Sequence, residues 1–163
     1  LMETIAVYWE PRIKTYGFNK LNNLSLFEFY YPAKKTAELG KILSNHNFQD
    51  IKTKFIIAQE SNNGISLVFC LPEKEGRDFH DSLKKTLSLK LHRYLYPVGI
   101  LFFHGPHFGD RYGIADAAFS SLLEADIKVI SSGCSSASVF LVLAEDDLSR
   151  AEEALSKAFD SAQ

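Results

Sequence analysis

Long apolar runs, clustered basic residues and a cysteine framework are all missing from this 163-residue sequence, and each absence excludes a class of protein. Without a run of about 18 apolar residues, we expect no membrane-spanning helix. The first residues also lack the basic and then apolar order of a secretory signal peptide. The basic residues are scattered and the net charge is −2, so the sequence gives no reason to expect nucleic acid as a partner. Two cysteines, Cys70 and Cys134, indicate reduced thiols rather than a disulfide framework, as expected of a cytoplasmic protein.

The sequence contains enough apolar material for one domain or for two small ones. Hydrophobic residues make up 46% of the chain and include thirteen Phe and seven Tyr. This proportion is ordinary for a globular protein. Several phenylalanines fall on predicted strands and are expected in the core, namely Phe27, Phe29, Phe55, Phe69, Phe102, Phe103 and Phe140.

The spacing of apolar residues predicts the same order of elements twice along the chain. In the first half we expect strands over 24–31, 52–59, 65–71 and 89–94, and helices over 36–45 and 77–86. In the second half we expect strands over 98–104, 128–132 and 138–144, a turn over 133–137, and helices over 114–124 and 148–159. A shift of 72 positions lays residues 66–73 over 138–145 without a gap. The repeat indicates an α/β (α+β) fold of two ferredoxin-like βαββαβ modules, with antiparallel sheets and helices on one face.

The second module ends at its last helix and has no closing strand of its own. A spare strand predicted over 13–21, ahead of an Asn22-Asn23 turn, can supply it. We therefore predict that the first module, residues 24–92, is nested inside the second, which consists of residues 13–23 and 95–163.

The stretch from Phe108 to Phe119 is the strongest candidate for a small-molecule site. It follows a predicted buried strand, holds Gly109 and Gly113, and leads into the predicted helix over 114–124. Such a loop leaves free backbone N–H groups at the helix N-terminus. Gly113 either lets a ligand approach the helix or meets a need for positive φ or close packing. Asp110 either pairs with the ammonium group of a ligand, or caps the helix or faces water.

Motifs for catalysis or metal binding are weak. His104 and His107, with Asp110 close behind, lack the spacing of a zinc site. Cys134 has no sequence signature of an activating base or of an oxyanion pocket near it. The glycine spacing of the loop matches neither a dinucleotide fingerprint nor a P-loop. We therefore expect no catalytic residue, no metal and no cofactor.

The same region resembles an ACT domain, in particular the second ACT domain of the aspartokinase regulatory region. The matching segments are residues 109–115, 123–133 and 136–142, together with the closing helix. Residues 24–92 resemble the first ACT domain more weakly. In that family the first ACT domain is nested in the second, an arrangement that the missing closing strand also predicts here.

The resemblance implies a module that senses a small amino acid and binds this effector where two ACT domains meet, usually across a homodimer. In the family, effector contacts come from the loop before the first helix and from the end of the second strand with its turn. In the second module these positions are Gly109, Asp110, Arg111, Tyr112, Gly113, Ile114, Ala115, Ser131, Ser132 and Ser136. In the first module they are Lys34, Lys35, Thr36, Gln59, Ser61 and Asn62.

Two departures from the family pattern bear on these expectations. The loop over 31–36 is short and lacks the family's glycine before the helix, although aspartokinases tend to bind their effector at the first ACT domain. In the second module, Ala137 stands where aspartokinases usually carry Asn.

Four functions stay open on the sequence alone. The first is a non-catalytic, dimeric regulator that binds an amino acid. The second is the regulatory portion of an aspartokinase whose kinase segment is not in this chain. The third is an enzyme on a ferredoxin-like scaffold, since a fold does not fix a function. The fourth is a protein-binding module that uses exposed sheet edges and binds no small molecule.

Overall fold

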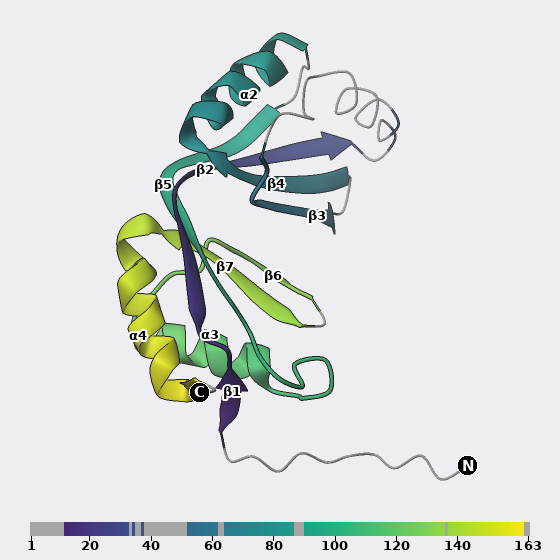
Figure 1. Cartoon of the computed structure of the whole chain (residues 1–163). Helices are drawn as coiled ribbons and strands as arrows, with labels where there is room; N and C mark the ends of the chain where they lie inside the picture. The colour runs from purple at the N-terminus through teal and green to yellow at the C-terminus, as the bar shows by residue number, and fades with distance from the viewer. Residues whose placement is uncertain are drawn as a thin grey trace, which may run out of the picture. The chain divides into compact units, whose positions relative to one another are not determined.

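Figure 1 shows the chain as a computed structural model, which describes residues 12–32, 34, 37, 52–61, 64–86, 90–135 and 137–161. These residues form a mixed α/β fold with a mostly antiparallel sheet and three α-helices among them, which confirms the predicted fold class. The chain divides into two compact units: unit 1 comprises Leu1–Leu21 and Gly99–Gln163, and unit 2 comprises Asn22–Val98. In sequence, unit 2 is therefore an insertion within unit 1.

The elements follow one another in the order that Figure 1 labels. The strands are β1 (Ile13–Thr15), β2 (Phe18–Pro32), β3 (Phe55–Ser61), β4 (Gly64–Pro72), β5 (Lys90–His104), β6 (Ser131–Cys134), β7 (Ser138–Ala144) and β8 (Phe159–Ser161). The helices are α2 (Glu73–Thr86), α3 (Ile114–Glu124), the short 3₁₀ helix η3 (Glu145–Asp147) and α4 (Leu148–Ala158). The helix predicted over 36–45 lies outside the described residues, apart from Ala37, which is helical.

Unit 2 is built on strands in the order β3-β4-β2-β5. β4 pairs antiparallel with β3 on one side and with β2 on the other. Because alternate residues of a strand point to the same face, Phe27 and Phe29 of β2 lie on one face together with Phe69 of β4. The rings of these three residues lie 5.4–6.1 Å from the ring of Phe79 in α2. α2 therefore covers this face with an aromatic core.

Unit 1 has the strand order β2-β5-β7-β6, with the neighbouring helices α3 and α4 packed on one face (Figure 1). Its core is mostly aliphatic and consists of Leu101, Phe103, Phe108, Ile114, Ala118, Leu122, Ile127, Val139, Leu141, Leu143, Leu148, Ala151, Leu155 and Phe159. The remaining strands, β1 and β8, form a separate two-stranded parallel sheet in which Ile13 pairs with Phe159.

Three predicted strand boundaries are wrong. β2 continues through the predicted Asn22-Asn23 turn, and within it Asn23 adopts a φ of 57°, a left-handed value that Asn tolerates. β5 likewise joins the strands predicted separately over 89–94 and 98–104. Conversely, the strand predicted over 13–21 is interrupted near Gly17, whose φ of 103° requires glycine. It is therefore divided between β1 and the start of β2.

Further differences lie at the ends of elements. α2 begins at Glu73 rather than at position 77, and β3 spans Phe55–Ser61 rather than 52–59. Two more differences depend on partner strands. β6 begins at Ser131 rather than at position 128, and it includes Gly133 and Cys134, for which the sequence predicts a turn. The last helix ends at Ala158, and Phe159 starts β8. In both places a partner strand satisfies the backbone N–H and C=O groups. Such distant partners leave no signal in the local spacing of apolar residues.

Candidate functional site

The predicted effector loop connects β5 to α3 in unit 1, and we call residues 105–113 the β5–α3 loop. Its backbone turns at His107, which has a φ of 61°, and the Asp110 N–H donates to the His107 carbonyl at 3.0 Å. Phe108 is buried, with its ring centroid 5.9 Å from that of Phe103 in the core. Gly109 and Asp110 are exposed. The loop is therefore anchored by one aromatic side chain and presents the residues that follow it to solvent.

Gly113 is the N-cap residue of α3 and has a φ of 86°. A Cβ at this position would meet nothing within 4 Å, so glycine is required by the backbone conformation and the close-packing interpretation is wrong. Glycine has no side chain with which to cap the first turn of the helix. The Ala117 N–H donates to the Gly113 carbonyl at 2.9 Å, which closes that turn. The N-terminus of α3 can therefore receive an anionic group such as a carboxylate.

Three consecutive side chains of the loop could contact a ligand at this helix end. Asp110 is exposed and does not occupy the N-cap position, so the capping interpretation of this residue is wrong. Arg111 donates from Nη1 to the Arg12 carbonyl at 3.3 Å. Tyr112 is 97% exposed. An acidic, a basic and an aromatic side chain thus stand next to the uncapped helix N-terminus.

The other predicted residues of unit 1 lie on α3 and β6. Ile114 is buried and Ala115 is exposed at the start of α3, whereas Ser131 and Ser132 are half-buried in β6. β7 lies between β5 and β6 in the sheet. The β5–α3 loop therefore follows a strand that is not adjacent to β6. Ser136 lies outside the described residues. The structure therefore brings residues 109–115 together and leaves the two serines on the edge strand.

The predicted site residues of unit 2 are only partly described. Lys34 is exposed, and Gln59 is exposed on β3, where it pairs with Ser66. Ser61 pairs with Gly64 at the end of the same hairpin. Lys35, Thr36 and Asn62 lie outside the described residues. A site in the first module stays a prediction.

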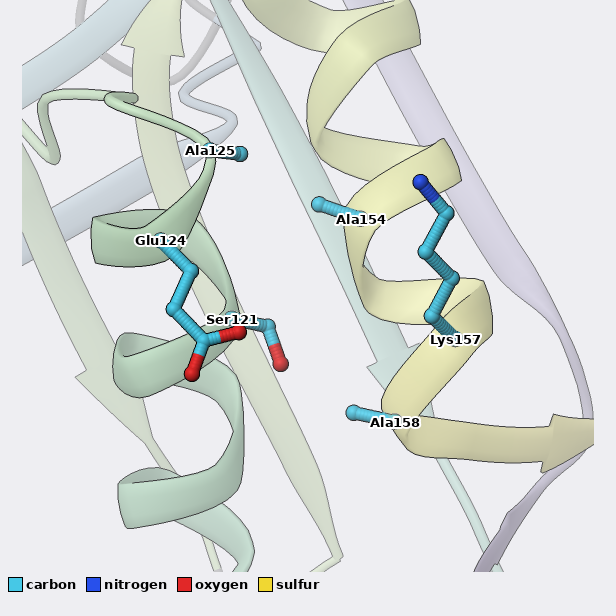
Figure 2. Close-up of a pocket in the computed structure, with 6 residues that line it drawn as sticks. All are labelled: Ser121, Glu124, Ala125, Ala154, Lys157 and Ala158. Carbon is cyan, nitrogen blue, oxygen red and sulfur yellow. The ribbon is translucent and has the colours of Figure 1, made fainter.

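A groove of about 330 Å³ lies between α3 and α4, away from the predicted residues (Figure 2). Its lining residues are Ser121, Glu124 and Ala125 on one side and Ala154, Lys157 and Ala158 on the other. Small side chains leave this space unfilled, and Glu124 and Lys157 border it from opposite helices. Ser121 Oγ already donates to the Ala117 carbonyl at 2.7 Å. The groove is a poorer effector site than the β5–α3 loop, because it offers three alanines and few convergent polar groups.

Sequence reasoning missed Thr15, which holds the start of the loop. Thr15 is 0% exposed, and its Oγ1 donates to the carbonyl of His104, the last residue of β5, at 2.8 Å. The Tyr16 N–H donates to the same carbonyl at 2.9 Å. The contact joins residues 89 positions apart. No local pattern around position 15 could therefore have predicted it.

Groups suited to other chemistries are scarce in the described part of the chain. It contains no cluster of three or more His, Cys, Asp or Glu side chains that could hold a metal ion. Cys70 is buried in β4, and burial raises the pKa of its thiol to about 12. The thiol is therefore protonated near neutral pH and is a poor nucleophile. None of the helices described here is long and apolar enough to cross a membrane.

Comparison with known proteins identifies the fold. No protein-family model matches the chain, and a search of curated proteins found no match. Among solved structures, it is similar to the ligand-free regulatory subunit of aspartate kinase from Thermus thermophilus. That match has a TM-score of 0.76 at 10% identity and covers 90% of this chain and 99% of that one. A structure of aspartokinase alpha and beta subunits matches with a TM-score of 0.74 at 18% identity, over 88% of this chain and 97% of that one.

Longer aspartate kinases match over a smaller share of their length. The structure of aspartate kinase from Synechocystis gives a TM-score of 0.76 at 13% identity, and the match covers 93% of this chain but 28% of that one. At identities this low, the agreement lies in the arrangement of the backbone. The chain has the fold of the regulatory ACT-domain region of aspartate kinase.

Proposed function

We propose that this chain is a non-catalytic regulatory protein or domain that binds a small amino acid at the β5–α3 loop and transmits its presence allosterically. The carboxylate of the ligand accepts hydrogen bonds from the backbone N–H groups at the start of α3. The Asp110 carboxylate pairs with the ammonium group of the ligand. The side chain of the ligand determines specificity. Only a ligand that binds one arrangement of the protein more tightly than another can transmit such a signal.

The observation that carries this proposal is the N-terminus of α3, where Gly113 at φ 86° leaves the first turn without a side-chain cap. A carboxylate there gains from the helix dipole, by about 0.3–1 kcal/mol at an exposed site, and from the unpaired N–H groups. Asp110 provides the opposite charge within three residues of this helix end. A zwitterion of amino-acid size matches both features.

The solved neighbours support the ligand class and the regulatory role. The structure of E. coli aspartokinase III in complex with lysine and aspartate matches this chain with a TM-score of 0.56 at 17% identity. Two neighbours that match over nearly their whole length are regulatory subunits of aspartate kinase. These likenesses support regulation rather than catalysis as the role of this chain.

Thermal unfolding against each of the twenty amino acids tests the proposal. A ligand at 100 times its Kd stabilises the folded state by about 2.7 kcal/mol, enough to raise Tm by several degrees. We expect one or two amino acids to raise Tm, and Asp110→Ala to remove the shift. Asp146→Ala, which deletes an exposed carboxylate before α4, is the matched control and should keep it. The absence of a shift with any amino acid would contradict the proposal.

The acting form in this proposal is a homodimer, for which unit 1 offers one flank of α3 and the edge strand β6. Ala115, Phe119 and Leu123 follow one another at a spacing of four residues, which places them on one side of the helix. Phe119 is 38% exposed and Leu123 is 80% exposed. Among the strands that the structure describes, β6 stands at the end of the order and pairs with β7. Identical edge strands can pair across a two-fold axis, and a second copy of the chain can cover apolar side chains that are exposed on a helix flank.

Light scattering tests the dimer. Leu123→Glu should produce a monomer, because it places a charge among the apolar side chains that the partner covers. Ser120→Glu adds the same charge at another exposed position of α3 and should leave the dimer intact. A wild-type protein that is monomeric with and without its amino acid would contradict this part of the proposal.

A further inference from the structure

β1 and β8 pair with each other and stand apart from the main sheet. Ile13, Lys14 and Thr15 lie opposite Phe159, Asp160 and Ser161, in parallel register. Arg12 strengthens this pairing, since its Nη1 lies 2.8 Å from Asp160 Oδ1 and its Nη2 donates to the Lys157 carbonyl at the end of α4. We call the pair of strands the clasp. Three residue pairs and an exposed ion pair place the clasp among the less stable parts of a fold.

The first strand of the clasp holds the point at which the β5–α3 loop begins. Both the Thr15 hydroxyl and the Tyr16 N–H donate to the His104 carbonyl, at 2.8 and 2.9 Å. The next residue, Gly105, lies directly against β1, because a Cβ there would be 2.2 Å from the Lys14 carbonyl oxygen. A change in the position of β1 must therefore change the start of the loop.

The far end of the loop contacts the clasp as well. Arg111 donates from Nη1 to the Arg12 carbonyl, next to β1. From the other strand, the Phe159 ring packs on Phe103 at 5.0 Å, and Phe103 packs on Phe108 of the loop at 5.9 Å. Hydrogen bonds thus connect the loop to β1, and an aromatic chain connects it to β8.

We infer that the β5–α3 loop and the clasp are coupled, so that each becomes more ordered when the other does, and that Thr15 is the positioning residue of the loop. A loop ordered by a ligand stabilises the pairing of β1 with β8, and an open clasp loosens the loop. By thermodynamic linkage, the two effects are equal in free energy. The ligand half of this inference rests on the proposed function, whereas the coupling of loop and clasp does not.

Hydrogen–deuterium exchange of the full chain without a ligand tests the coupling. Thr15→Val keeps the shape of the side chain and removes the hydroxyl. It should speed the exchange of residues 105–113 and 159–161 by about threefold to tenfold or more, because the hydrogen bond to the His104 carbonyl is lost and the Gly17 N–H, which donates to the Thr15 hydroxyl at 3.3 Å, loses its acceptor. Thr15→Ser keeps the hydroxyl and should restore near wild-type rates. Faster exchange confined to residues 13–15 would overturn the inference.

Two further variants control this experiment. Ser156→Ala also removes a hydroxyl that donates to a carbonyl, that of Glu152 at 2.8 Å on α4, and should change neither segment. Arg12→Ala weakens the clasp at an exposed position, where folding is not at risk, and should change the exchange of residues 105–113 in the same direction as Thr15→Val. An unchanged loop in Arg12→Ala and Thr15→Val together would contradict the coupling.

The amino acid found in the thermal screen completes the test. It should slow exchange at residues 13–15 and 159–161 in the wild-type chain, and this protection should be smaller in Thr15→Val. A bound amino acid with unchanged exchange at the clasp would overturn the inference and leave the proposed function intact. A screen without any ligand would contradict the proposed function, while the exchange of the Thr15 variants would still decide the coupling.

Discussion

Both units pack helices on a sheet, but they fill their cores with different side chains. In unit 2, the rings of Phe27, Phe29 and Phe69 gather around Phe79 of α2. Unit 1 is mostly aliphatic, and its buried phenylalanines are those that connect the β5–α3 loop with the clasp. The comparison shows that aromatic packing forms the centre of unit 2, whereas in unit 1 it lies beside the candidate site.

Truncation of the central ring of unit 2 should have the largest effect. Phe79→Ala should reduce the free energy of unfolding by about 3–5 kcal/mol, because three aromatic neighbours lose their partner. The matched change in unit 1, Leu122→Ala, should cost about 2–5 kcal/mol. Urea unfolding followed by circular dichroism measures both. In Phe79→Ala, protection from hydrogen exchange should fall in β2 and β4. An equal fall of protection in α3 and β7 would contradict the distinction between two cores.

The next largest loss of stability is expected for a substitution at Gly76 of α2, which packs against the aromatic core of unit 2. A Cβ at Gly76 would lie 2.9 Å from Cε2 of Phe27 and 3.2 Å from Cβ of Ser25, both buried. Gly76→Ala should therefore destabilise the protein by about 1–3 kcal/mol through overpacking, although alanine is the better helix former. Asp78→Ala, at an exposed position of the same helix, is the control and should change stability by no more than about 0.5 kcal/mol. A Gly76→Ala variant more stable than wild type would show that α2 is not pressed against Phe27.

The two cysteines differ in burial: Cys70 is buried in the sheet of unit 2, whereas Cys134 is exposed on β6 of unit 1. Below pH 9 the thiol of Cys70 is protonated in both folded and unfolded chains. Above pH 9 the unfolded chain releases this proton, while burial keeps the folded-state pKa at about 12. Stability should therefore fall between about pH 9 and 12, by at most about 1.4 kcal/mol per pH unit from this group. Cys70→Ala should flatten the pH dependence and Cys134→Ala, on exposed β6, should not; equal slopes in the two variants would contradict the assignment.

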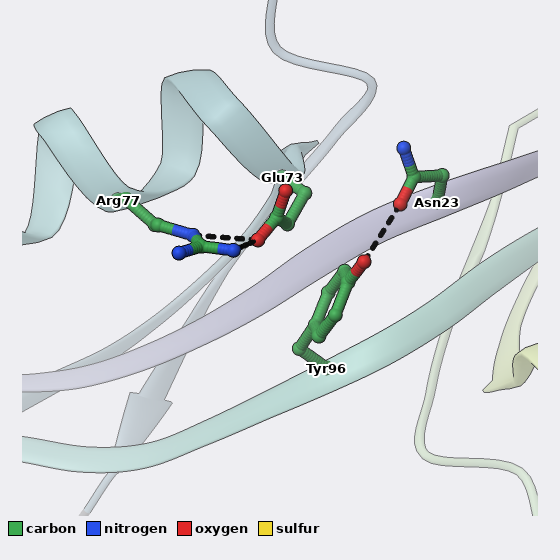
Figure 3. A network of polar contacts seen from close by, with 4 residues as sticks. All are labelled: Asn23, Glu73, Arg77 and Tyr96. Carbon is green, nitrogen blue, oxygen red and sulfur yellow. Dashed lines mark hydrogen bonds and ion pairs between the residues drawn. The ribbon is translucent and has the colours of Figure 1, made fainter.

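Two arginines on helices should give the smallest effects. Arg77 donates to Glu73 one turn earlier on α2 (Figure 3), and Arg77→Ala should cost about 0.2–0.5 kcal/mol, as is usual for an exposed pair of this spacing. Arg150 of α4 binds Asp147 and also donates to the carbonyl of Ala125, the C-cap of α3, at 2.8 Å. Arg150→Ala should therefore cost more, about 0.5–1.5 kcal/mol. Chemical denaturation in low and high salt measures both, and a larger loss for Arg77→Ala would reverse the expected order.

Two elements with strong local periodicity could be predicted from the sequence to the residue. The helix over 114–124 and the strand over 138–144 have the predicted bounds, because apolar side chains recur at the helical and strand periods and both segments are buried on one side. The glycine at the start of α3 was likewise predictable as a special backbone position. Whether it serves conformation or packing depends on the space around it, which local spacing does not show.

The parts that depend on distant partners could not be predicted. Asn23 reads as a turn residue, yet its side chain accepts a hydrogen bond from the Tyr96 hydroxyl at 2.9 Å, and β2 continues past it (Figure 3). The three-residue strands β1 and β8 are too short to show a period and pair across most of the chain. Thr15, the polar residue that holds the loop, belongs to one of them. The candidate site could thus be located from its loop, but its support could not.

Gly105 also has a consequence for the ancestry of this chain. Its missing side chain makes room for the Lys14 carbonyl and the Phe108 ring, so any substitution would collide with the backbone of β1. A descendant that lost β1 would be released from this restriction and could accumulate other residues at position 105. In a set of related sequences, glycine at this position should therefore be inherited together with the N-terminal strand.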